Sequence, residues 1–244
     1  MTMRFIALAA TTLAFASPSQ AAEIRLLSTN AAKTVLEELV PQFEKTTEHK
    51  VVFVFGTAAG LKTEIEKGAA VDVALLTDGG VDDLIKQGKL AKRVPFASSG
   101  IAVAIKKGAP KPDLSSTEAF KKTLLSAKSI AWVEQGASGI YLKGLFEKLG
   151  VADQLKGKLK SVKASAPAVA DGEAEIGFTQ ISEILPYAGA EVAGPLPAEI
   201  QLTTNFAFGV GANPKDAKAA EALVAFITTP AAATVIKAKG LDPR

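Results

Sequence analysis

Cysteine is absent from the 244-residue sequence, and histidine occurs once, as His49. The lack of thiols excludes a disulfide framework, a cysteine metal site and a thiol nucleophile, so the hydrophobic core must stabilise the chain alone. His49 lies in the polar connector "TTEHK", which we expect to form a solvated turn. It is therefore not expected to act as the base that a serine nucleophile requires.

Nucleotide-binding and metal-binding motifs are also absent. No phosphate-binding loop of the G-x-x-x-x-G-K-[ST] type occurs, and "GVGANP" (209–214) has proline where a dinucleotide motif needs its third glycine. The acidic stretch "TDGGVDD" (77–83) lacks the alternating oxygen ligands of a calcium loop. We interpret it as the first turn of a helix, where acids are favoured, and predict no cofactor and no metal cation.

Long apolar runs are absent except near the N-terminus. Residues 5–16 form a run of apolar or small side chains after Arg4, and Ser19-Gln20-Ala21 fits a small-x-small cleavage site. Because spanning a bilayer takes about 20 apolar residues, we predict a cleavable signal peptide over 1–21 and export to the periplasm rather than a membrane anchor. The formal net charge of +3 falls by one when Arg4 is removed. The interspersed charges give no footprint for nucleic acid or anionic lipid.

Short β-branched runs alternate with helical patterns through the rest of the chain. Continuous apolar runs predict buried strands at 24–27, 51–55, 71–76, 101–105, 130–133 and 176–179. Apolar residues spaced i, i+3, i+4 and i+7 predict helices between them. This order predicts an α/β fold with a central, mainly parallel sheet and helices on both faces.

Two small or polar segments, Val94–Gly100 and Gln201–Asn205, interrupt this pattern. Each could be a crossing between two lobes. That interpretation predicts one lobe from 22–97 plus 208–244 and a second lobe from 98–207. Periodicity leaves open a single doubly wound sheet with an antiparallel edge.

A serine hydrolase is the first enzyme class to test. Ser138 stands in "GASGI", which has Ile140 where a nucleophile elbow requires glycine. A serine–lysine pair remains open, since no spacing singles one out. We therefore predict a binding protein and no enzyme, and keep a periplasmic serine hydrolase as the alternative of another class.

Three loops of one kind stand out: "LSTNAAK" (27–33), "GTAAGLK" (56–62) and "GASGIYLK" (136–143). Each follows a predicted strand, carries small or hydroxyl side chains and opens a helix. At the carboxyl ends of parallel strands, the free N–H groups and positive dipole end of a helix attract anions. Two such loops in one lobe and one in the other predict a cleft that holds a small anion from both sides.

Arginine is scarce in this region. After the signal only Arg25, Arg93 and Arg244 occur, and none lies in the three loops. A site for a di- or tricarboxylate usually recruits a bidentate arginine, whereas neutral N–H and O–H dipoles can hold a compact oxyanion. The scarcity favours an inorganic oxyanion.

At these residues the chain resembles the periplasmic substrate-binding proteins of ABC importers, in the type with two crossings between lobes, and within them the molybdate-binding group. The likeness covers essentially the whole mature chain. It rests on the opening from "STNAAK", on "GASGIYLKGLFEKLG" (136–150) and on Phe55, Leu61, Ile65 and Gly68 at the family's spacing. The resemblance implies a type II two-lobed fold, a molybdate- or tungstate-like ligand and an inner-membrane ABC permease as partner, and we expect a monomer.

The resemblance also implies a set of ligand-binding residues. They are Ser28, Thr29, Asn30, Thr57 and Ala58 in lobe one, and Ser138, the N–H of Gly139 and Gln180 in lobe two. Two of them depart from the family, because Ala58 occupies a serine position and Gln180 a tyrosine position. A small organic acid or another anion therefore stays open as the ligand.

Overall fold

The computed structural model describes residues 21–244, so the predicted signal peptide, apart from Ala21, lies outside the described residues. The strands are β1 (Glu23–Thr29), β2 (Lys50–Gly56), β3 (Val73–Thr77), β4 (Leu90–Lys106), β5 (Ile130–Trp132), β6 (Leu159–Ser161), β7 (Ile176–Gln180), β8 (Ala190–Pro195), β9 (Thr203–Gly211) and β10 (Asp242–Pro243). The α-helices are α1 (Lys33–Thr47), α2 (Ala58–Glu66), α3 (Asp78–Lys86), α4 (Thr117–Ser126), α5 (Ala137–Lys148), α6 (Ala152–Leu155), α7 (Ser165–Ala170), α8 (Ile181–Ile184), α9 (Ala217–Ile227) and α10 (Ala232–Ala238), with 3₁₀ turns η1 (Asn30–Ala32) and η2 (Ala198–Ile200). The alternation confirms the α/β class.

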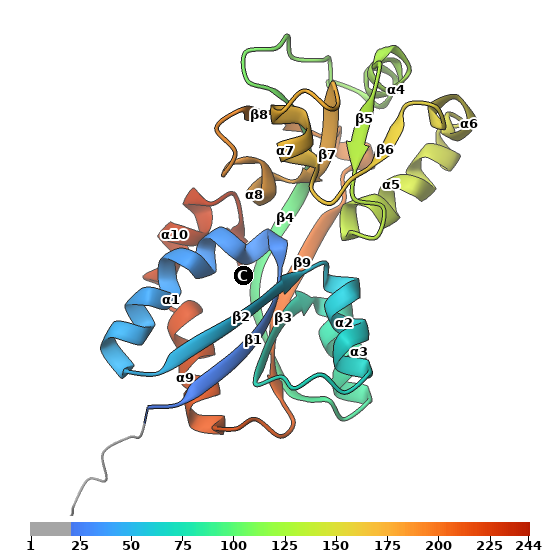
Figure 1. Cartoon of the computed structure of the whole chain (residues 1–244). Helices are drawn as coiled ribbons and strands as arrows, with labels where there is room; N and C mark the ends of the chain where they lie inside the picture. Colours follow the sequence, from blue (N-terminus) through green and yellow to red (C-terminus); the bar gives the residue numbers. More distant parts are fainter. Residues whose placement is uncertain (1–20) are drawn as a thin grey trace, which may run out of the picture.

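The first lobe is built on three parallel strands in the order β2-β1-β3, with β9 and β4 antiparallel beside them. Successive side chains of a strand point to opposite faces. Leu26 therefore joins a core with residues of α1, α9 and α10, while Leu27 joins a second core with residues of α2 and α3. Helices cover both faces of this sheet (Figure 1).

The second lobe repeats this plan with the parallel strands β7-β5-β6 and the antiparallel strands β4 and β8. Along β4, Ile101 and Val103 enter a bulky core with residues of α4 and α5. Ala102 and Ala104 point the other way, into a core of small residues with α7 and α8. Each lobe thus has two cores of its own.

Two long strands, β4 and β9, join the lobes (Figure 1). They pair from Leu90↔Gly211 to Gly100↔Thr203, after which β4 continues to β7 and β8. The predicted crossing segments lie in β4 and around the start of β9, so the two-crossing arrangement is confirmed. The boundaries at 97/98 and 207/208 fall within these strands and remain a prediction.

His49 is buried, so the prediction of a solvated turn is wrong. Its Nδ1 accepts a hydrogen bond from the Ala22 N–H at 3.0 Å, and its ring centroid lies 5.9 Å from that of Phe43. The preceding Glu48 has φ +62°, which turns the chain back and places His49 against the core. His49 directly precedes the amino end of β2, away from the loops at the carboxyl ends.

The acidic stretch 77–83 forms the end of β3 and the start of α3, as its sequence predicts. Thr77 caps α3 by accepting a hydrogen bond from the Gly80 N–H at 3.3 Å. The Asp78 carboxylate lies 3.3 Å from Arg93 and 2.9 Å from Arg244. Two of the three arginines in the described chain therefore hold the first lobe together.

The α9–α10 pair is an apolar, bent helical segment. Between residues 21 and 244 no single helix meets the length and apolar composition needed to cross a membrane, and only this bent pair does so in combination. Leu223 and Ile227 of α9 and Ile236 of α10 are buried in the first lobe, which accounts for their apolar character.

Candidate functional site

Two loops of the first lobe lie side by side where β1 and β2 end. The two strands are parallel, and their last residues, Thr29 and Gly56, are paired in register. Each strand leads directly into a helix, β1 through η1 into α1 and β2 into α2. Because parallel strands end at the same edge, the first and second predicted loops are brought together as expected.

The second lobe contributes the ends of β5 and β7. These strands are also parallel, and Trp132 pairs with Phe178 near their carboxyl ends. From there α5 begins after the third predicted loop, and α8 begins directly after Gln180. Across the lobes, α8 contacts η1, so both groups of loops face a common cleft.

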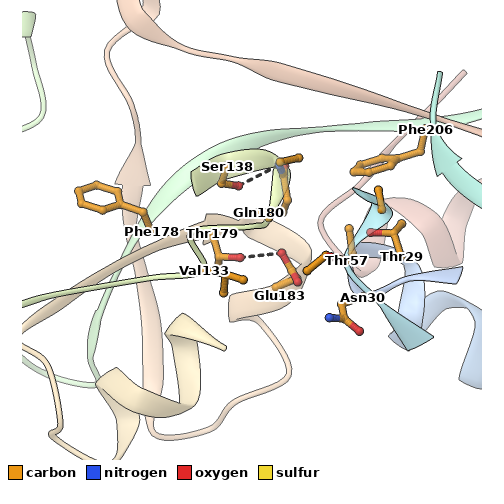
Figure 2. A pocket seen from close by; sticks show the side chains of 14 residues that line it. Thr29, Asn30, Thr57, Val133, Ser138, Phe178, Thr179, Gln180, Glu183 and Phe206 are labelled. Carbon is orange, nitrogen blue, oxygen red and sulfur yellow. Dashed lines mark hydrogen bonds between the residues drawn. The ribbon is translucent and has the colours of Figure 1, made fainter. Parts of the chain in front are cut away.

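The cleft encloses an inner cavity in which about 40 Å³ is open to the centres of water molecules. Figure 2 shows side chains of both lobes facing each other across it. Its lining residues are Thr29, Asn30, Ala31, Thr57, Ala58, Val133, Gly136, Ala137, Ser138, Phe178, Thr179, Gln180, Glu183 and Phe206. Six of the eight predicted ligand-binding residues are therefore brought together here.

The other two predicted residues, Ser28 and Gly139, do not line the cavity. The Ser28 side chain is fully buried, and its hydroxyl donates to the Thr29 carbonyl at 3.1 Å. Gly139 lies against the preceding loop, where an added Cβ would come within 2.8 Å of the Val133 carbonyl carbon. Ser28 is therefore part of the core, and Gly139 lets α5 approach the loop before it. The role of Ser28 and of the Gly139 N–H in ligand binding stays a prediction.

Hydroxyl and backbone groups with free hydrogens line the inner cavity. Thr57 caps α2 by accepting a hydrogen bond from the Gly60 N–H at 3.1 Å, which leaves its own O–H free to donate. Ala137 and Ser138 are the first residues of α5, so their N–H groups have no acceptor within the helix. Helix starts of this kind bind anionic groups. The described residues hold no group of His, Asp and Glu placed to bind a metal ion.

Gln180 links the cleft to the two crossing strands. Its side chain is 3% exposed. Its amide is oriented with the nitrogen toward the carbonyl oxygens of Ser99 at 2.9 Å and Gly100 at 3.1 Å, while its oxygen accepts from Ser138 and Thr204, each at 3.2 Å. Both amide hydrogens are thus committed to β4. Gln180 lines the cleft but is not a free donor as expected, and it connects Ser138 to the crossings.

In the described part of the chain, Glu183 is the one ionisable residue in the lining of the inner cavity, and the sequence prediction did not include it. It stands in the first turn of α8, and its carboxylate accepts a hydrogen bond from the Thr179 hydroxyl at 2.6 Å (Figure 2). Burial raises the pKa of this carboxyl, although the Thr179 hydroxyl and the Gln180 N–H act in the opposite direction. An acid three residues after a strand end, in "TQISE", is the signal that could have found it.

The raised pKa of Glu183 predicts a pH-dependent cost to stability. A carboxyl whose folded pKa lies above its unfolded value favours folding at low pH, and this contribution is lost as pH rises through the folded pKa. Glu183→Gln should therefore be more stable than the wild type at pH 8 and equally stable at pH 4. At pH 8 each kcal/mol of added stability should raise the Tm by about 2–4 °C. Thermal unfolding at both pH values measures this. Glu191→Gln, at a half-exposed residue outside the cleft, should show no such gain; an equal gain there would contradict the assignment.

A second, outer cavity adjoins the first. It leaves about 270 Å³ for water centres and shares Asn30, Thr179 and Glu183 with the inner cavity. Its remaining lining residues are Lys33, Thr34, Glu37, Ala164, Ser165, Ala166, Ser182, Pro186 and Tyr187. Two of these are notable: Lys33 supplies a cation, and the buried Ser182 hydroxyl has no hydrogen-bond partner. The outer cavity is therefore polar and can receive a charged group.

Comparisons with known proteins agree with this architecture. The sequence model described as bacterial extracellular solute-binding protein matches residues 24–242. The chain is 32% identical to an aconitate isomerase of a Pseudomonas species over 97% of this chain and 93% of that one. It is 29% identical to the molybdate-binding protein of Azotobacter vinelandii over 96% and 95% of the two chains.

A solved structure supports the same conclusion for the fold. The periplasmic molybdate-binding protein of Azotobacter vinelandii superposes with a TM-score of 0.74 at 23% identity, over 89% of this chain and 98% of that one. The resemblance to substrate-binding proteins of ABC importers is thereby confirmed. The chain belongs to the family of bacterial extracellular solute-binding proteins.

Proposed function

We propose that this protein captures a small organic acid with more than one carboxylate between its lobes in the periplasm and delivers it to an inner-membrane ABC permease. The pair of adjoining cavities carries this proposal. The inner cavity, with about 40 Å³, suits one carboxylate held by neutral donors. The rest of the acid extends into the outer cavity, with about 270 Å³, where Lys33 and the Ser182 hydroxyl meet a second carboxylate.

Glu183 supports an organic acid over a compact oxyanion. A tetrahedral oxyanion presents oxygen atoms in every direction, so one of them would face the Glu183 carboxyl, and like charges at short distance are unfavourable. An organic acid can turn a C–H group toward Glu183 instead. The lack of arginine in the loops favoured an inorganic ligand in the sequence analysis. Lys33 in the outer cavity supplies the cation that a second carboxylate requires. The relative named aconitate isomerase supports the same ligand class.

Molybdate or tungstate is the second candidate. The neutral O–H and N–H donors around the inner cavity favour it, as does the relative named molybdate-binding protein.

The hydrolase alternative has no such support. Among the described residues the hydrogen-bond partner of the Ser138 hydroxyl is the Gln180 amide oxygen, which accepts a hydrogen bond but is not a base that can remove the proton.

A thermal-shift screen separates the candidates. The probes are trans-aconitate, citrate, tricarballylate, succinate, molybdate, tungstate and sulfate. A ligand at about one hundred times its Kd adds about 2.7 kcal/mol, or about 5–10 °C in Tm for a chain of this length. We expect the tricarboxylates to give this shift. A shift with molybdate and tungstate alone would establish the second candidate and contradict the proposal.

Lys33→Met should weaken tricarboxylate binding selectively. Lys33 opens α1 at the outer cavity, and its half-exposed ammonium lies 3.8 Å from the Glu37 carboxylate and 5.7 Å from the centroid of the Phe55 ring. A partly solvated ion pair contributes about 1 kcal/mol, so the Kd of a tricarboxylate should rise about three- to tenfold, with little change for acetate, whose single carboxylate occupies the inner cavity. Titration calorimetry measures both. Lys45→Met, at the far end of the same helix, is the matched control and should change neither; equal effects at the two positions would exclude a local contact.

A further inference from the structure

Glu183 occupies the junction of the two cavities. It lines both of them, together with Asn30 and Thr179. Figure 2 shows its carboxylate on the second-lobe side of the cleft, beside the Thr179 hydroxyl and facing the side chains of the first lobe. A ligand that extends from the inner into the outer cavity must therefore pass this carboxylate.

The charges around Glu183 leave it without a cationic partner. The ionisable groups that share the outer cavity with it are Lys33, Glu37 and Tyr187, and Lys33 pairs with Glu37. None of the ion pairs within residues 21–244 includes Glu183. Its hydrogen-bond partner is the Thr179 hydroxyl at 2.6 Å, a neutral donor. Such an environment suits a group that gains and loses a proton.

A capping role accounts for only part of this arrangement. Glu183 is the third residue of α8, the position from which a capping box reaches back to the N–H of the cap residue, here Gln180. A capping box of this kind accepts glutamine as well as glutamate at the third position. Capping therefore requires an oxygen acceptor there, and gives no reason for an ionisable carboxyl that borders both cavities.

We propose that Glu183 transfers a proton within the bound acid, so that the protein isomerises an unsaturated di- or tricarboxylic acid. This rests on the proposed binding of an organic acid. The Glu183 carboxylate takes a proton from a CH₂ group that lies between a carboxylate and the carbon–carbon double bond. The C–H electron pair forms a new double bond, the old one shifts its electrons onto the conjugated carboxylate, and a dienolate results. The protonated Glu183 then returns the proton to the other end of the three-carbon unit.

The donors of the cleft complete this mechanism. The extra negative charge of the dienolate is spread over carboxylate oxygens, where the Thr57 hydroxyl and the N–H groups of Ala137 and Ser138 bind. Thr179 is a positioning residue, since its hydroxyl holds the carboxylate of Glu183. Nothing is consumed in the cycle, so only the substrate is required. Replacing the Glu183 carboxyl by a neutral amide would leave binding and capping in place and remove the proton acceptor.

The test follows trans-aconitate by proton NMR in D₂O with the complete chain apart from the predicted signal peptide. We expect conversion to the cis isomer with deuterium entering the product. Glu183→Gln should lower the rate about 10²–10⁴-fold while the Kd measured by calorimetry changes less than about threefold, the size of a weak contact. Glu191→Gln, outside the cleft, should keep the wild-type rate.

Thr179→Val separates a positioning role from a structural one. Removing its hydrogen bond, which lowers the pKa of Glu183, should move the ascending limb of the pH–rate profile to higher pH. Wild-type turnover by Glu183→Gln would overturn the role of Glu183. Binding of trans-aconitate without isomerisation by the wild type would overturn the isomerase proposal and leave the binding function standing. No binding of any carboxylate would overturn the proposed function itself.

Discussion

Gly139→Ala is expected to lose about 10–100-fold in ligand affinity, because a displacement of about 1 Å at a binding group has effects of this size. A Cβ at this position would lie 2.8 Å from the Val133 carbonyl carbon and 2.9 Å from Glu134 Cα, and closer still to the Val133 oxygen. These are backbone atoms, so either α5 or the loop before it must move. The N–H groups of Ala137 and Ser138 would then leave the position from which they face the cleft.

Titration calorimetry with whichever ligand the screen identifies measures this loss, and thermal unfolding measures the accompanying strain of about 1–3 kcal/mol. Gly144→Ala is the matched control in the same helix. No atom lies within 4 Å of a Cβ added there, so it should keep affinity and add up to about 1 kcal/mol of stability through better helix propensity. Unchanged affinity in Gly139→Ala would mean that the start of α5 does not bind the ligand.

Asp72→Ala should destabilise the first lobe by about 3–6 kcal/mol, since each hydrogen bond to a charged group contributes about 1.5–3 kcal/mol. The buried Asp72 carboxylate accepts from the Arg25 N–H of β1 and from the Lys215 N–H ahead of α9, each at 2.7 Å. It thereby joins three segments that are distant in sequence. Alanine would leave two donors without their acceptor, which is costly in a protein interior.

Urea unfolding monitored by circular dichroism measures the free-energy loss, and thermal unfolding should show a corresponding drop of about 6–24 °C in Tm. Asp153→Ala is the control, because the Asp153 side chain is 91% exposed and pairs only with Lys156. Exposed pairs contribute about 0–1 kcal/mol. A comparable loss in both variants would exclude the special role of Asp72.

The two proposals concern one cleft, in a fold shared by relatives that are named for different functions. A relative named aconitate isomerase and one named molybdate-binding protein each match nearly the whole chain at similar identity. A shared fold does not fix the chemistry of a site. Our proposals assign the difference between binding and conversion to the cleft side chains, with Glu183 as the proton-transferring group.

Sequence patterns placed several site residues correctly for local reasons. Thr57 and Ser138 follow apolar runs and stand at helix starts, and both conditions depend on residues close in the chain. Gln180 lines the cleft as expected, but its side chain hydrogen-bonds within the protein, which local patterns do not reveal. Its partners Ser99, Gly100 and Thr204 belong to the crossing strands, which only long-range pairing brings beside it.

The sequence by itself determined the α/β class and the presence of hydroxyl-bearing helix starts, because apolar periodicity and turn residues act over a few positions. Periodicity left one sheet or two lobes open, and the pairing of β4 with β9 decided for two crossings. The tertiary structure alone decided the burial of His49 and Ser28, the close approach at Gly139, and the joining of two cavities at Glu183. These features arise where strand register and the contact between the lobes bring distant segments together. An ionisable side chain in a short helix has no periodic signal, and its pKa depends on that enclosure.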